Sequence, residues 1–70
     1  MTIGETIRKL RKERTLTQKQ IADLLGITYQ AVSNWEHNKN APDLTQIPRL
    51  AQIFGVTTDY LLGLERPDKK

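Results

Sequence analysis

Apolar residues recur at helical spacing along this chain, most regularly between Gln18 and His37. Ile21 and Leu25 are four residues apart, and Val32 and Trp35 are three apart. Each pair is therefore expected on one face of a short helix, with the polar residues on the other faces. The stretch predicts two consecutive amphipathic helices.

The junction between these two helices has the composition of a sharp turn. Gly26 can take the left-handed conformation that ends a helix without steric strain at Cβ. Ile27 follows it and is expected to fill the corner, while Ala22 is small enough to let two helices cross closely. The spacing predicts a helix-turn-helix.

Capping residues agree with these boundaries. Thr17 with Gln20 has the form of a capping box, and so has Thr2 with Glu5 near the start of the chain. Thr28 is placed to cap the second helix of the pair. Three helix starts are thus predicted independently of the apolar pattern.

A fourth helix is expected after residues 37–43, which are rich in helix breakers. Pro48 decides where it begins. With Asp43 as the cap, Pro48 would fall inside the helix and remove a needed hydrogen-bond donor. With Thr45 as the cap, Pro48 lies in the first turn, so the helix is expected to begin near Gln46.

The two ends of the chain complete the pattern. A first helix is expected to run to about Arg14, and a short last helix from its cap at Thr57 to Leu62. Five short helices and no strand predict the all-α class. Residues 1–64 are expected to form one domain, and residues 65–70 a flexible tail.

Composition narrows the possible functions. The 70 residues include no cysteine, so disulfides and thiolate metal sites are excluded. No apolar run approaches the roughly 20 residues of a membrane span, and a cytoplasmic protein without membrane association is expected. His37 is the only histidine and the carboxylates are scattered, so neither an enzyme nor a metal, cofactor or small-molecule site is expected.

The net charge of +3 is unevenly distributed. Residues 1–40 contain seven Lys and Arg against four Asp and Glu, whereas residues 41–64 contain one against two. The positive charge lies in the half that holds the predicted helix-turn-helix. This favours a polyanion as partner, although a solvated basic face would look the same.

The second helix of the predicted pair has an outward face of uncharged hydrogen-bonding side chains: Tyr29, Gln30, Ser33 and Asn34. Gln and Asn can form two hydrogen bonds with adenine in the major groove of DNA, and Ser can donate or accept. These residues are the candidates for reading bases. The alternative is a merely polar, exposed helix.

Candidates for phosphate contacts lie at both ends of this unit. Free N–H groups at a helix start favour an anion, and a loop that follows a reading helix can reach the opposite strand. The candidates are Thr17, Gln18, Thr28, Asn38, Lys39 and Asn40. Such contacts would fix the register on DNA without reading sequence.

From Ile3 to Leu64 the chain resembles the phage-repressor and Cro type of helix-turn-helix protein, the XRE family. The resemblance is carried by the stretches IRKLRKERTLTQKQIADLLGIT, SNWEHNKNAPDL and LAQIFGVTTDYLLG. It implies a compact five-helix DNA-binding domain, formed around helices 2 and 3, that regulates transcription. It also implies a homodimer on a palindromic operator.

The resemblance assigns roles to particular residues. It places phosphate contacts at Thr17, Gln18 and Lys39, and base reading at Tyr29, Gln30 and Asn34. It also pairs an arginine of the first helix, Arg11, with the glutamate that closes the reading helix, Glu36. Such a pair would be structural if it is buried.

The last helix is the expected dimer surface, through Thr58, Tyr60, Leu61 and Leu64. The alternative is that Leu61 and Leu64 complete the core of a single chain. The favoured interpretation is a sequence-specific regulator that binds double-stranded DNA, acting as a homodimeric repressor. The alternative is an antitoxin or co-regulator whose main role is to bind a protein partner.

Overall fold

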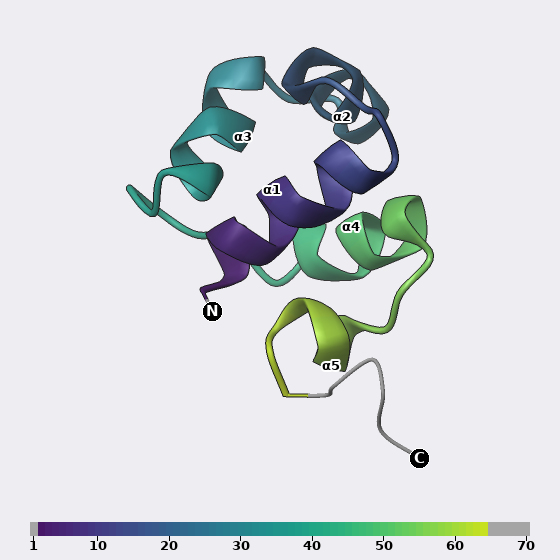
Figure 1. The fold of residues 1–70 in the computed structure, drawn as a ribbon. Helices are drawn as coiled ribbons and strands as arrows, with labels where there is room; N and C mark the ends of the chain where they lie inside the picture. Colours follow the sequence, from purple (N-terminus) through teal and green to yellow (C-terminus); the bar gives the residue numbers. More distant parts are fainter. Residues whose placement is uncertain (1, 65–70) are drawn as a thin grey trace.

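The computed structural model describes residues 2–64, which form five α-helices and no strand (Figure 1). They are α1 (Ile3–Glu13), α2 (Gln18–Leu25), α3 (Tyr29–Glu36), α4 (Gln46–Phe54) and α5 (Thr58–Leu61). The all-α class and the five predicted helices are therefore confirmed. The predicted flexible tail, residues 65–70, lies outside the described residues.

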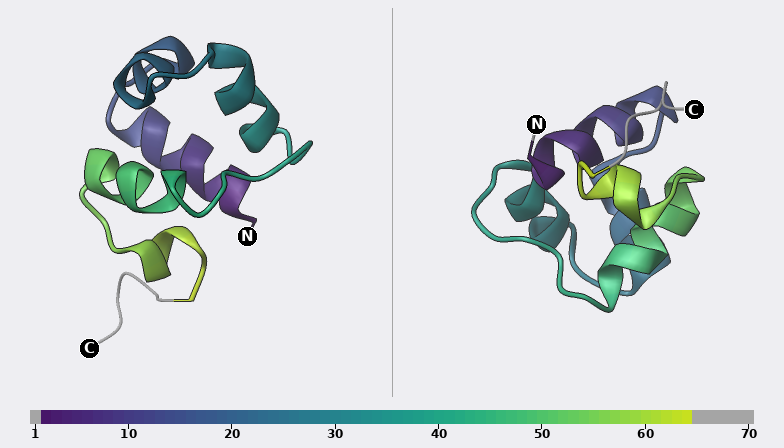
Figure 2. Two further views of the ribbon diagram at one scale, coloured as in Figure 1. Left: turned by 180° about the vertical axis from the view of Figure 1, so that it is seen from behind. Right: turned by 90° about the horizontal axis from the view of Figure 1, so that it is seen from below.

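The helices are arranged around α1. In Figure 1, α2 and α3 lie above α1, and α4 and α5 lie below it. The view from behind in Figure 2 shows the same order, and α1 packs against both α3 and α5. No helix among residues 2–64 is long and apolar enough to cross a bilayer.

The predicted capping residues stand at the observed helix starts. The Thr2 hydroxyl accepts from the Glu5 N–H at 3.1 Å, and the Glu5 carboxylate accepts from the Thr2 N–H at 2.9 Å. Thr17 and Gln20 form the same box, with bonds of 3.0 and 2.8 Å. Thr28 caps α3 through the N–H three residues on, at 3.4 Å. Local sequence therefore sets these three starts.

The start of α4 is as predicted, but its capping side chain is not. The helix begins at Gln46, so Pro48 falls harmlessly in the first turn. Thr45 makes no side-chain cap, and instead Asp43 accepts from the Thr45 hydroxyl at 2.6 Å and from the Gln46 N–H at 3.2 Å. The Thr45 hydroxyl bond, followed by the backbone donors, lowers the pKa of Asp43. Thr45 is therefore the residue that precedes the helix, as predicted, but its side chain does not cap the helix. The Asp43 carboxylate, which lies in the turn before the helix, accepts the hydrogen bond from the first helical N–H instead.

All five helices end in the same way. At the end of each helix, either the C-cap residue or the residue after it has a positive φ. Backbone N–H groups at that point then donate to carbonyl oxygens of the last helical turn. At the end of α2, for example, the Ile27 N–H donates to the Ala22 carbonyl at 3.0 Å. The left-handed residues are Thr15 (φ 53°), Gly26 (72°), Asn38 (60°), Gly55 (70°) and Gly63 (81°). Only at Thr15 does a β-branched residue occupy this conformation.

The core lies where the five helices meet. Buried apolar side chains come from every helix: Ile7, Leu10, Ile21, Ala22, Leu25, Val32, Trp35, Ile47, Leu50, Ala51, Phe54 and Leu61. In α4 it is Ile47 that faces inward, whereas Leu44 is 88 % exposed. The four residues whose helical spacing predicted α2 and α3, namely Ile21, Leu25, Val32 and Trp35, all belong to this set.

Two tertiary contacts of α1 were not predicted. Gly4 is buried where α1 crosses the end of α3, and a Cβ there would lie 2.0 Å from the Trp35 carbonyl oxygen. At the other end of α1, the Arg14 guanidinium donates to the Phe54 carbonyl of α4 at 3.0 and 2.6 Å. Both contacts join residues that are distant in sequence. They fix the position of α1 against the two halves of the molecule.

Candidate nucleic-acid interface

The helices α2 and α3 form the predicted helix-turn-helix. Gly26 ends α2 in the left-handed conformation, and Ile27 is half-buried against the core at the corner. Ala22 is buried, as expected for a residue at a close helix crossing. This geometry holds the outer face of α3 clear of the rest of the chain.

A buried polar network fixes α3 to the two preceding helices. Arg11 of α1 donates through Nε to Glu36 Oε2 at 2.7 Å and through Nη2 to Oε1 at 3.1 Å. The side chain of Glu36 is only 2 % exposed and that of Arg11 only 15 %. Gln18 of α2 adds a bond from Nε2 to Glu36 Oε1 at 3.0 Å. The predicted Arg11–Glu36 pair is thus confirmed as a bidentate, buried ion pair.

The network bears on one of the candidate phosphate contacts. The Gln18 side chain is half-buried and one of its amide hydrogens is used by Glu36, so it is not a free, flexible donor. Arg11 also donates from Nη1 to the Leu16 carbonyl at 3.1 Å, which ties down the turn before α2. The start of α2 is therefore held rigidly beside the end of α3.

The outer face of α3 carries the four candidate base-reading residues. Tyr29 and Gln30 are exposed, and Ser33 and Asn34 are half-buried. Gln30 Nε2 donates to Asn34 Oδ1 at 3.1 Å, one helical turn away. This bond uses the Gln30 amide as donor and the Asn34 amide oxygen as acceptor, which leaves the Gln30 oxygen and the Asn34 NH2 group for other partners. The face is polar, uncharged and not covered by other described parts of the chain.

The other candidate phosphate contacts lie around this face. The hydroxyls of Thr17 and Thr28 accept cap bonds at the starts of α2 and α3, where helix N–H groups are concentrated. Asn38, Lys39 and Asn40 are exposed in the turn after α3. Among residues 2–64, no carboxylate lies within ion-pair distance of Lys39. Its charge is free for a ligand.

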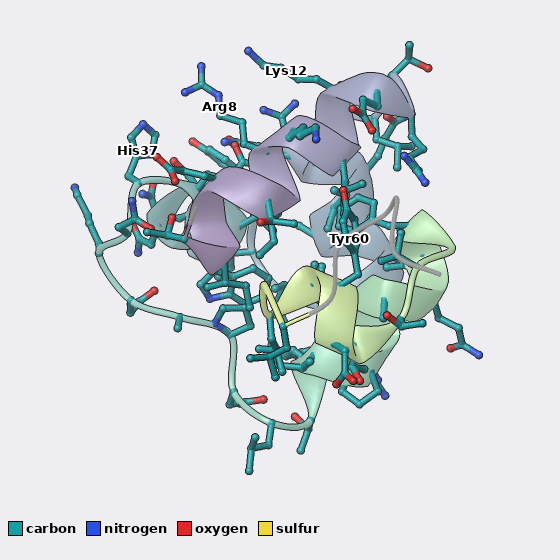
Figure 3. All side chains as sticks on the ribbon, turned by 60° about the horizontal axis from the view of Figure 1, so that its bottom comes forward. Arg8, Lys12, His37 and Tyr60 are labelled. Atoms are coloured by element: carbon teal, nitrogen blue, oxygen red, sulfur yellow. The ribbon has the colours of Figure 1, made fainter. Side chains whose placement is uncertain are left out.

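The structure changes the expected dimer surface. Leu61 has 0 % exposure and belongs to the core, because α5 packs this side chain against α4 and α1. It was wrongly included in the surface, and the alternative of a core role is correct for it. Thr58 and Tyr60 are half-buried, and in Figure 3 Tyr60 lies on the side of α5 that faces α1. Leu64, by contrast, is 72 % exposed.

Two features near the reading face were missed from sequence. His37 Nδ1 lies 2.8 Å from the Ser33 carbonyl oxygen and 3.4 Å from its hydroxyl. Asn38 takes a positive φ of 60° and places its side chain near Gly4 of α1. The i, i+4 spacing of Ser33 and His37 was a signal for the first contact. Nothing in the local sequence indicated the second.

Metal chemistry finds no support in this region. Among the described residues, no group of three or more His, Cys, Asp or Glu is placed to hold a metal ion. The polar side chains gathered here are amides, hydroxyls and cations. Such groups suit hydrogen bonds to bases and phosphates.

A family model described as helix-turn-helix matches residues 7–61. The chain belongs to this family, in its phage-repressor type. The predicted resemblance is confirmed over most of the described residues. The family's defining unit coincides with α2 and α3.

Similar proteins carry related names. The SPbeta prophage-derived uncharacterized HTH-type transcriptional regulator YonR of Bacillus subtilis is 42 % identical over 59 residues, which are 84 % of this chain and 55 % of that protein. The HTH-type transcriptional regulator ImmR of the same organism is 34 % identical over 70 residues, or 100 % of this chain and 55 % of that one. The chain thus spans about half the length of these curated relatives.

A solved structure extends the likeness to three dimensions. The P22 c2 repressor, crystallised with a synthetic operator, superimposes with a TM-score of 0.86 at 28 % identity. The match covers 93 % of this chain and 98 % of that one. The family and the fold are thereby established together.

Proposed function

We propose that this chain is a sequence-specific binding module for double-stranded DNA and that it regulates transcription. The observation that carries the proposal is the outer face of α3, where a 3.1 Å bond joins exposed Gln30 to half-buried Asn34. Two adjacent amides with free donors and acceptors match the edge of adenine in the major groove. Tyr29 and Ser33 extend the same face.

Repression is the mode of regulation that we favour. A protein that occupies an operator can block transcription without any further activity, and the outer face of α3 offers a docking surface for DNA. The P22 c2 repressor, which has the same fold, is seen with operator DNA. This assignment also places the protein in the cytoplasm, where its DNA target would lie.

Phosphate contacts would dock the module. The starts of α2 and α3, at Thr17 and Thr28, present helix N–H groups beside the reading face. Lys39 lies on the opposite edge of that face and has no ion-pair partner among residues 2–64. Lys39→Ala is expected to weaken binding to all sequences alike and to flatten the salt dependence by about one unit.

A homodimer would supply affinity that one small module lacks. With Leu61 in the core, the exposed residue that remains of the four predicted ones is Leu64, beside half-buried Thr58 and Tyr60. Two copies would read half-sites about 34 Å apart, on one side of the duplex. Sedimentation with and without a palindromic duplex tests this, and a monomer under both conditions contradicts it.

The decisive experiment is selection of bound duplexes from a random pool at physiological salt. We expect enrichment of one motif by the native chain and a changed preference at one base pair for Gln30→Ala. Lys39→Ala serves as the matched control, since it should weaken recovery without altering the motif. If the native chain enriches no motif from the pool, sequence-specific binding is contradicted.

One observation favours the alternative role as a co-regulator that binds a protein. The outer side of α2 carries a shallow, largely apolar groove lined by Leu16, Gln20, Asp23 and Leu24, and Leu24 is exposed. Apolar patches rimmed by polar residues can mark protein contact sites, and this groove combines Leu16 and Leu24 with Gln20 and Asp23. Leu24→Ser is expected to leave duplex selection unchanged. If the groove binds a protein partner, the same variant should also fail to regulate transcription in cells.

A further inference from the structure

A row of cationic side chains lies beside the reading face and has no assigned role. Arg8 and Lys12 are exposed on α1, one helical turn apart, and His37 follows the end of α3. Figure 3 shows all three side chains projecting from the same side of the molecule. We call this set the α1 edge.

Contacts on either side of Arg8 place it against the end of α3. Four residues before it, Gly4 lies against the Trp35 carbonyl and the Asn38 side chain. Three residues after it, Arg11 is bonded to Glu36. Residues at these spacings share one face of a helix, so Arg8 is held between two contacts with the last turn of α3. Arg8 and His37 therefore project from neighbouring parts of the same side of the molecule (Figure 3).

His37 connects this edge to the reading face. It is one turn beyond Ser33 on α3, and its Nδ1 lies 2.8 Å from the Ser33 carbonyl. A carbonyl oxygen can only accept, so Nδ1 carries the hydrogen and Nε2 is left free. In the neutral ring Nε2 is an acceptor, which a phosphate oxygen would repel. In the cationic ring it is a charged donor, which a phosphate oxygen attracts.

The charges around His37 leave the edge positive. Among residues 2–64, Arg8, Lys12 and Lys39 have no carboxylate within ion-pair distance. Glu36 is fully engaged by Arg11 and Gln18, and the Glu5 carboxylate accepts from the Thr2 N–H. Glu13, the other carboxylate of α1, pairs with Arg14 at 3.2 Å. Glu5 keeps its charge, but no carboxylate of α1 or α3 is paired with Arg8 or Lys12.

From this arrangement we propose that Arg8, Lys12 and His37 form an additional phosphate-binding edge for nucleic acid, outside the predicted contacts of α2 and the α3 turn. Double-stranded DNA carries a negative charge about every 1.7 Å along its axis. A duplex that seats the outer face of α3 in its major groove therefore presents backbone to the adjacent edge of α1. The proposal deepens the proposed function and rests on it for the orientation of the duplex.

The salt dependence of binding gives this edge a signature. Each phosphate contact contributes about 0.9 to the slope of log affinity against log salt concentration. Loss of a cation that binds a phosphate should therefore be visible in that slope.

The test measures this slope on a random-sequence duplex with the full chain. Arg8→Gln and Lys12→Gln should each flatten the slope by about one unit relative to the native protein. His37→Gln should flatten it as well, because the ring that binds a phosphate oxygen is the cationic one.

Lys9→Gln is the matched control. Lys9 is exposed on the same helix, but it lies about 100° around the axis from Arg8, away from α3. A slope changed as much by Lys9→Gln as by Arg8→Gln would mean a general effect of net charge and would overturn the proposal. So would slopes that none of the variants changes.

The readout separates this proposal from the proposed function. Binding to a random duplex depends on phosphate contacts and not on sequence preference. Failed selection from a pool would therefore contradict sequence-specific binding, while the salt slopes would still test the α1 edge. Native enrichment of a motif with unaltered slopes in all variants would overturn the edge alone. A native chain that bound no duplex would overturn both.

Discussion

Two polar pairs are anchored on α3, and they differ in what surrounds them. Glu36 and Arg11 form a bidentate ion pair that is almost fully buried, whereas Gln30 and Asn34 form a single amide bond at the surface. The first pair satisfies its hydrogen-bonding groups within the protein. The second leaves several unsatisfied and exposed to solvent. The buried Arg11–Glu36 pair therefore stabilises the fold, whereas the Gln30–Asn34 pair at the surface is available to a ligand.

The difference has a physical basis. A charged pair inside a protein stabilises the fold only while both partners are present, because either one alone is a buried, unpaired charge. An exposed amide can exchange its partner for water or for a base at little loss. The two pairs should therefore respond to mutation in opposite ways.

The largest expected effect is at Glu36. Glu36→Ala should lower the free energy of unfolding by about 3–5 kcal/mol, since it strands the Arg11 guanidinium and a Gln18 amide in a buried site. Thermal or urea unfolding measures it. Glu13→Ala is the control, because the Glu13–Arg14 pair is exposed and should contribute less than about 1 kcal/mol. An unchanged midpoint for Glu36→Ala contradicts the structural role.

Gly4→Ala should show that the same end of α3 depends on a close helix crossing. Alanine has the higher helix propensity, by about 1 kcal/mol, but its Cβ would meet the Trp35 carbonyl oxygen at 2.0 Å. The clash outweighs propensity, and we expect a net loss of about 1–3 kcal/mol in unfolding experiments. Lys9→Ala, at an exposed site on α1, should be close to neutral. A stabilised Gly4→Ala would show that the crossing is looser than described.

Gln30→Ala should give the opposite result to Glu36→Ala. It should weaken binding to the selected duplex by about 1–3 kcal/mol and leave random duplexes nearly unaffected. Stability should change by less than about 0.5 kcal/mol, because the residue is exposed. Titration of both duplexes, with a melting curve, separates the two effects. Equal weakening on random DNA would remove Gln30 from the base-reading set.

The smallest effect is expected at Thr15. Its φ of 53° is unfavourable for a β-branched side chain, so Thr15→Gly should raise the unfolding free energy by about 1 kcal/mol. Gly55→Thr is the reverse control, at φ 70° with open space where a Cβ would lie, and should lower stability by a similar amount. Loss of stability in Thr15→Gly would mean that the Thr15 hydroxyl bond to the Arg14 carbonyl, at 2.6 Å, outweighs the strain.

Most of the secondary structure was predictable because its causes are local. The capping boxes at Thr2 and Thr17 act over three residues, and Pro48 restricts the start of α4 over a single turn. The cap of α4 escaped prediction because Asp43 acts from outside the helix through a turn. The outer face of α3 was predictable for a related reason: once Val32 and Trp35 are buried, helical geometry fixes which residues point away.

The sequence by itself determined the five helices, the turn at Gly26 and the four side chains presented by α3, since each follows from periodicity or from a neighbour within one turn. Only the tertiary structure decided which residues serve the interior. It buried Leu61, placed Gln18 in the Glu36 network, packed Gly4 against α3 and put Arg8 and His37 on one side of the molecule. These outcomes depend on how helices far apart in sequence cross, and no local pattern encodes the distance between two helices.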